Sequence, residues 1–205
     1  MKFRTFAHAF LACAAAAAMA GCPIGAADAP LTVPTATVSG SAAATSPTPT
    51  GNDLARQFPT CRDPSQADSW RAEILFMVNR ERAIRGLDPL VLNQTLEQQA
   101  TQYACEMIQY NFFAHENPVT GSTLPDRAAE FAYDYLVIGE NLAAGQESPV
   151  QVMREWMASP GHTANIVDAR FTEIGIGVRA GGEFGFYWVQ EFGLPTRTQS
   201  LLNSP

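Results

Sequence analysis

Apolar side chains recur with a helical period through the middle of the chain. Between residues 69 and 85, apolar positions such as Ile74 and Val78 share one face, and Gly86 follows as a stop signal. Asn93 is a good N-cap for a second amphipathic helix, which is predicted to run to about Asn111. The pattern therefore predicts two long helices, each with one face turned to a core.

Two further helices are predicted from shorter apolar stripes. One spans residues 124–131, after turn-forming residues at 118–121. The other begins at Pro149, because proline is favoured in the first helical turn, and it ends at Ser159-Pro160-Gly161.

Extended segments are marked by alternating apolar positions. Residues 90–92 form a short extended piece, and residues 135–138 lead into an irregular segment at 139–142. Two strands are predicted at 173–179 and 184–192, with a glycine turn between them. Helices that precede strands in this way predict an α+β sandwich.

The N-terminal segment has the design of an export signal. Lys2 and Arg4 precede an apolar run at 6–20, which is shorter than the about 20 residues that a permanent membrane helix needs. Met19-Ala20-Gly21-Cys22 resembles a lipoprotein signal, in which Cys22 is acylated and becomes the new N-terminus. The alternative is ordinary cleavage after Ala20, which would leave Cys22 as a free or intermolecularly paired thiol.

Composition divides the chain into four parts. Residues 1–21 are the leader, and residues 22–60, rich in Ala, Thr, Pro, Ser and Gly without periodicity, are predicted to be a disordered tether. Residues 61–195 are long enough to form a single domain with its own core, and residues 196–205 form a C-terminal tail.

Charge and cysteine usage narrow the classes of function. The formal charge is −7, and removing the two positive charges of Lys2 and Arg4 with the leader makes it −9. Nothing basic is clustered, which argues against nucleic acid as a partner. Cys61 and Cys105 remain as an even pair once Cys22 is acylated, so we expect them to form a disulfide in an oxidising compartment. Two separate buried thiols are the alternative.

Three ionisable residues lie at breaks between the predicted elements, where side chains can converge on a cleft. They are His115, Glu140 and His162. None of the pairs has the i, i+4 spacing of a helical metalloprotease motif, and each residue alone is compatible with a structural role.

Five motifs resemble the bacterial branch of the CAP superfamily, which comprises cysteine-rich secretory, antigen 5 and pathogenesis-related proteins and is also called SCP-like. The similarity covers about residues 69–194. The motifs, in order, are FAHENP at 113–118, GENL at 139–142, WMASPGHTANI at 156–166, EIGIGV at 173–178 and YWVQEF at 187–192.

The resemblance implies a three-layer α-β-α sandwich with a small central antiparallel sheet and a cleft where His115, Glu140 and His162 converge. Two neutral imidazoles and a carboxylate suit Zn²⁺ or a similar divalent cation, with His115 and His162 as metal ligands. Animal members have a further Glu where this chain has Ser159, so the set is incomplete. Glu155, four residues earlier on the same predicted helix, is a candidate to reach the same cleft.

Other residues of these motifs have structural interpretations. We expect Asn141 to hold the irregular segment by hydrogen bonds to backbone and Trp156 to fill the core. Asn165 is expected to anchor the loop after His162. Gly175 and Gly177 are expected to allow close packing on the sheet.

Three functions are compatible with these expectations. The resemblance favours a non-catalytic extracellular module that binds a lipid such as a sterol, another small ligand or a protein partner in a His/Glu-lined cleft. The second is a metal-dependent hydrolase of peptides or cell-wall material, with His115 and His162 holding the metal and Glu140 as general base. The third is a structural surface protein without a ligand. The expected location is the cell envelope, through a lipid anchor in the membrane, or else the secreted medium.

Overall fold

The computed structural model describes residues 51–196, with side chains from Leu54 onward. The leader, Cys22, the tether up to residue 50 and the tail from residue 197 lie outside the described residues. No helix within 51–196 has the length and apolar character needed to cross a membrane. The elements follow in the order α1 (Gly51–Gln57), α2 (Ala67–Ile84), β1 (Val91–Leu92), α3 (Gln94–Tyr110), α4 (Leu124–Glu130), β2 (Tyr135–Ala144), α5 (Pro149–Ala158), α6 (Pro160–Ile166), β3 (Glu173–Gly181) and β4 (Gly185–Pro195).

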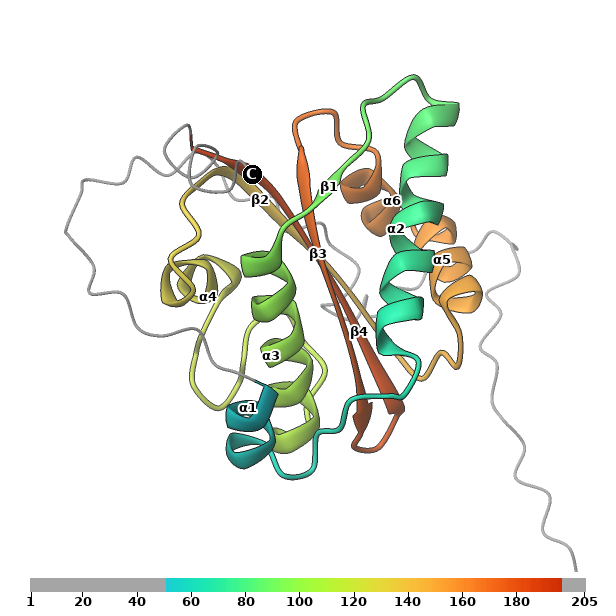
Figure 1. The fold of residues 1–205 in the computed structure, drawn as a ribbon. Helices are drawn as coiled ribbons and strands as arrows, with labels where there is room; N and C mark the ends of the chain where they lie inside the picture. Colours follow the sequence, from blue (N-terminus) through green and yellow to red (C-terminus); the bar gives the residue numbers. More distant parts are fainter. Residues whose placement is uncertain (1–50, 197–205) are drawn as a thin grey trace, which may run out of the picture.

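A four-stranded sheet in the order β1-β3-β4-β2 lies between two layers of helices (Figure 1). Helices α2, α5 and α6 cover one face, and α1, α3 and α4 lie on the other. This confirms the predicted three-layer α-β-α sandwich. The sheet is mixed rather than purely antiparallel, because the short strand β1 pairs in parallel with β3.

Each face of the sheet has its own apolar core. On the α2/α5/α6 side, Ile74 and Val78 of α2 pack with Trp156 of α5 and Trp188 of β4. All four are at most 1% exposed. Ile74, Val78 and Met153 of the predicted apolar stripes therefore face this core, whereas Val150, predicted to belong to the fourth helix's stripe, is 57% exposed.

Helix α3 lies directly against β3 because two strand residues have no side chain. A Cβ at Gly175 would come within 2.1 Å of the Leu96 carbonyl carbon, and one at Gly177 within 2.5 Å of the Ala100 backbone. The helix begins as predicted, since the Asn93 side chain accepts a hydrogen bond from the Leu96 N–H at 3.0 Å. Both the cap and the close packing on the sheet are confirmed.

The segment entering the domain is ordered before Cys61. Helix α1 falls inside the range predicted to be a disordered tether, and Phe58 is 1% exposed in the core beneath α3. The predicted Cys61–Cys105 disulfide is confirmed, with a Cα–Cα distance of 5.2 Å. Arg62 then pairs with Ala180 near the end of β3. The ordered domain thus starts earlier than the sequence boundary, because Phe58 has a core site to fill.

Two elements differ from the sequence prediction. Residues 139–142 are not irregular but belong to strand β2, whose backbone pairs with β4 in antiparallel register. Ser159-Pro160-Gly161 ends α5 as expected, but it also begins helix α6, which was not predicted. Ser159 caps α6 by accepting a hydrogen bond from the His162 N–H at 3.5 Å, and Pro160 occupies the first turn.

Candidate functional site

A cavity of about 270 Å³ lies between strand β2 and helices α5 and α6. Trp156 forms part of its wall, with the indole N–H donating to the Leu142 carbonyl oxygen at 3.2 Å. Its wall combines apolar and polar side chains. The lining residues are Phe113, Leu142, Ala143, Ala144, Gln146, Glu155, Trp156, Ser159 and His162.

The residues predicted to share a cleft fall into two groups. Glu155, Ser159 and His162 line the cavity. His115 and Glu140 are not among its lining residues and are buried, at 6% and 1% exposure. Ser159, at the position where animal members have a further Glu, thus lies in the cavity wall. Glu155, one helical turn earlier, supplies a carboxylate to the same cavity.

Two asparagines fasten strand β2 to the segment that carries His162. Asn141 Nδ2 donates to the His162 carbonyl oxygen at 3.1 Å. Asn165 Nδ2 donates to the Glu140 carbonyl oxygen at 3.0 Å and to Asn141 Oδ1 at 2.9 Å. Because β2 is an edge strand, the bonds from Asn165 to the Glu140 carbonyl and from Trp156 to the Leu142 carbonyl cover groups that would otherwise lack a ladder partner. The asparagines therefore hold a strand edge, not an irregular segment.

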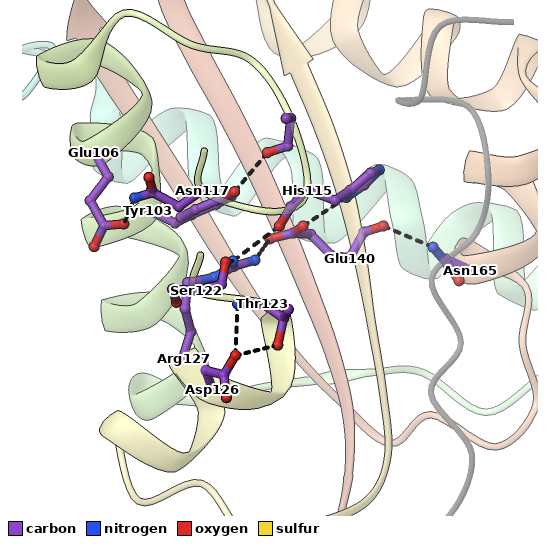
Figure 2. A network of polar contacts seen from close by, with 11 residues as sticks. Tyr103, Glu106, His115, Asn117, Ser122, Thr123, Asp126, Arg127, Glu140 and Asn165 are labelled. Atoms are coloured by element: carbon purple, nitrogen blue, oxygen red, sulfur yellow. Dashed lines mark hydrogen bonds and ion pairs between the residues drawn. The ribbon is translucent and has the colours of Figure 1, made fainter. Parts of the chain in front are cut away.

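His115 and Glu140 form the centre of a buried polar network (Figure 2). His115 Nδ1 lies 2.7 Å from Glu140 Oε1, and Arg127 Nη2 donates to Glu140 Oε2 at 2.5 Å. Arg127 Nη1 also donates to the His115 carbonyl oxygen at 3.1 Å. A carboxylate held by a guanidinium only accepts, so the His115 Nδ1 carries the hydrogen and the imidazole is fixed in one tautomer.

Arg127 was not identified from the sequence, although it organises this network. It projects from α4, which begins at a capping box in which Asp126 Oδ2 accepts from the Thr123 N–H at 2.9 Å. The hydrogen bonds from Thr123 lower the pKa of Asp126. The guanidinium carbon lies 3.4 Å from the centre of the Tyr103 ring, and burial raises the pKa of Tyr103. The only sequence signal was a cation on a short, otherwise mostly apolar helix.

Glu191 is a second buried carboxyl group that sequence reasoning missed. It lies opposite Glu140 in the β2/β4 register and is 0% exposed. Neither of its oxygens makes a hydrogen bond of good geometry within the described part of the chain. Burial raises the pKa of Glu191 well above 4.5, and Glu140 adds to this, while Arg127 acts in the opposite direction. The fold therefore favours the protonated form of Glu191. In the sequence, the sign of this buried carboxyl group was a charged residue among the apolar neighbours of a predicted strand.

The residues do not fit the predicted zinc site. Both oxygens of Glu140 are already engaged, one of them by the positive charge of Arg127, which would repel a dication. Among residues 51–196, no group of three or more His, Cys, Asp or Glu side chains is placed to hold a metal ion. His115, Glu140 and Arg127 instead form a buried hydrogen-bonded group that supports strand β2 beside the cavity.

Sequence comparison places these motifs in a known family. The sequence model of the cysteine-rich secretory protein family, CAP, matches residues 75–192, which include every residue of the cavity and the buried network named above. The chain is 36% identical over 133 residues to the uncharacterized protein YkwD of Bacillus subtilis (strain 168), covering 65% of this chain and 50% of that protein. The chain thus spans half the length of this relative.

Two solved structures have a similar fold. An extracellular protein containing an SCP domain from Bacillus anthracis is 28% identical with a TM-score of 0.56, covering 62% of this chain and 41% of that one. An outer surface protein from Borrelia burgdorferi is 21% identical with a TM-score of 0.59, covering 65% of this chain and 97% of that one.

Proposed function

Because the chain belongs to the cysteine-rich secretory protein (CAP) family, we propose that it is an exported, non-catalytic module that binds a small amphipathic ligand in the cavity beside β2. The cavity carries the proposal. Its wall combines the apolar side chains of Phe113, Leu142 and Trp156 with polar groups, which suits a ligand with an apolar body and a polar head.

The volume of the cavity limits the size of the ligand that it can hold. The volume of about 270 Å³ is just below the range typical of ligand pockets, which is about 300 to 1,000 Å³. A small molecule, or one end of a longer lipid, therefore fits better than a whole sterol. A side chain of a protein partner is the remaining alternative.

The state of Glu140 favours binding over hydrolysis. A general base must be within hydrogen-bond reach of the proton it abstracts, and Glu140 is 1% exposed with both oxygens engaged. The Ser159 hydroxyl lies in the cavity wall, where its oxygen accepts the His162 N–H bond that caps helix α6.

Several features support export and anchoring. The Bacillus anthracis neighbour is described as extracellular and the Borrelia neighbour as an outer surface protein. The Cys61–Cys105 disulfide fits an oxidising compartment. We propose that acylation of Cys22 anchors the chain to a membrane, which a mass spectrum of the mature N-terminus tests directly.

Native mass spectrometry of the mature chain, isolated from its own producer, tests the cavity. Ala144 lines the cavity, so Ala144→Phe should fill it and abolish a retained small-molecule mass seen in the wild type. Ala158→Phe adds the same side chain at an exposed position of α5 outside the lining and should retain the mass. If Ala144→Phe folds normally and keeps the same bound mass, the ligand lies elsewhere and the proposal fails.

A further inference from the structure

The polar groups in the cavity wall come from Gln146, Glu155, Ser159 and His162. Among its nine lining residues, Glu155 is acidic and none is Lys or Arg. Its carboxylate accepts hydrogen bonds from Gln146 Nε2 at 2.5 Å and Gln151 Nε2 at 3.1 Å. Both donors are neutral amides, so they orient the carboxylate and leave its negative charge in place.

The amide beside Glu155 presents an acceptor that lacks a partner. The hydrogen bond from Gln146 Nε2 to the carboxylate fixes which end of the amide is oxygen, and that oxygen, Oε1, is buried without a hydrogen bond. A buried carbonyl left in this way costs free energy that a donor would recover. The oxygen is closed to solvent, so a ligand N–H group would supply this donor once the amide turns toward the cavity, whereas a ligand carboxylate cannot donate to it.

Two of the N–H donors in the cavity wall, those of Trp156 and Gln146, are already engaged. The Trp156 indole N–H donates to the Leu142 carbonyl oxygen, and the Gln146 amide donates to Glu155. The aromatic rings of Trp156 and Phe113 also form part of the wall, and aromatic faces attract cations rather than anions.

We infer that the cavity selects ligands whose polar head is a protonated amine, with Glu155 as the counter-ion and Gln146 as a second acceptor. This inference rests on the proposed binding function and names the class of ligand. Carboxylates and phosphates of the same apolar body bind more weakly, because they would face the negative charge of Glu155 in a wall that holds no Lys or Arg.

Three probes with the same apolar body separate charge from apolar contact. Hexylammonium, hexan-1-ol and hexanoate are titrated into the mature chain by isothermal calorimetry at neutral pH and constant ionic strength. We expect hexylammonium to bind at least about tenfold more tightly than hexanoate, with the alcohol between them. In Glu155→Gln the ratio of ammonium to alcohol affinity should fall to about one.

Glu147→Gln is the matched control, because it removes the same charge from an exposed residue outside the lining. It should keep the ammonium preference within about twofold. Equal binding of the three probes, or a preference for hexanoate, overturns this inference while leaving a binding cavity in place. Absence of binding by all three at about 10 mM also overturns it, and the Ala144→Phe experiment then decides the binding function separately.

Discussion

Replacing Glu191 by Gln should remove a pH dependence from the stability of this domain. Glu191 is fully buried opposite Glu140, and burial raises its pKa well above 4.5. Glutamine has nearly the same shape but cannot titrate. The variant therefore isolates the free energy linked to the proton on this one carboxyl group.

The magnitude follows from linkage between protonation and folding. Below the ordinary pKa, Glu191 is protonated in both the folded and the unfolded chain, so it contributes no pH dependence. Above that pKa the unfolded chain loses the proton while the folded chain retains it, so the free energy of unfolding falls by about 1.4 kcal/mol per pH unit until the raised pKa is reached. The slope is the predicted quantity, and it applies between the ordinary and the raised pKa of Glu191.

Urea unfolding followed by tryptophan fluorescence measures this difference between about pH 5.5 and about pH 7.5 at constant ionic strength. Trp156 and Trp188 are both buried and report on the folded core. Groups common to both proteins cancel in the comparison, so the wild type should lose stability relative to Glu191→Gln as pH rises. The exposed Glu183→Gln control should follow the wild type.

The reasoning would be refuted by parallel pH profiles for the wild type and Glu191→Gln. Parallel profiles would mean that Glu191 has the same protonation in the folded and unfolded chains. If the parallel profiles are also separated by a constant loss of stability in the variant, that loss reports packing and not protonation.

Two further substitutions test the supports of the fold. Arg82 is 1% exposed and donates to the carbonyl oxygens of residues 88, 166, 168 and 171. Arg82→Met should therefore lower the unfolding free energy measured in urea by at least about 3 kcal/mol. The surface variant Arg85→Met should lower it by less than about 1 kcal/mol. A cost below that of Arg85→Met would show that these carbonyl groups find other partners. The double substitution Cys61→Ala/Cys105→Ala opens a loop with a sequence separation of 44 and should lower the unfolding free energy by about 4 kcal/mol. An unchanged denaturation midpoint would contradict the chain-entropy account.

Signals contained within a few residues were sufficient for much of the fold. The Asn93 cap, the apolar stripe of α2 and the alternation in β3 each depend on neighbours in sequence, so their physical causes could be recognised directly. Gly175 and Gly177 indicated close packing because any side chain at these positions would collide with α3.

Features that depend on distant partners were not predictable in the same way. GENL at 139–142 forms a strand because β4 supplies its ladder and Asn165 and Trp156 bond its outer edge. The pairing of Arg127 with Glu140 joins α4 to β2. The approach of His115 to Glu140 was expected only from the family resemblance, since their spacing of 25 residues carries no geometric information.

The Cys61–Cys105 disulfide and the Arg62–Ala180 backbone pairing also determine how the domain would respond to mechanical load. Tension applied through the N-terminal end would reach Cys61 and pass across the sulfur–sulfur bond into the middle of α3, and through the backbone bonds of Arg62 into the end of β3. Helix α2 and strand β1 lie inside the covalent loop and would carry none of that force until the bond breaks. Pulling at the N-terminal end would therefore leave α2 and β1 outside the covalent path of the load for as long as the disulfide is intact.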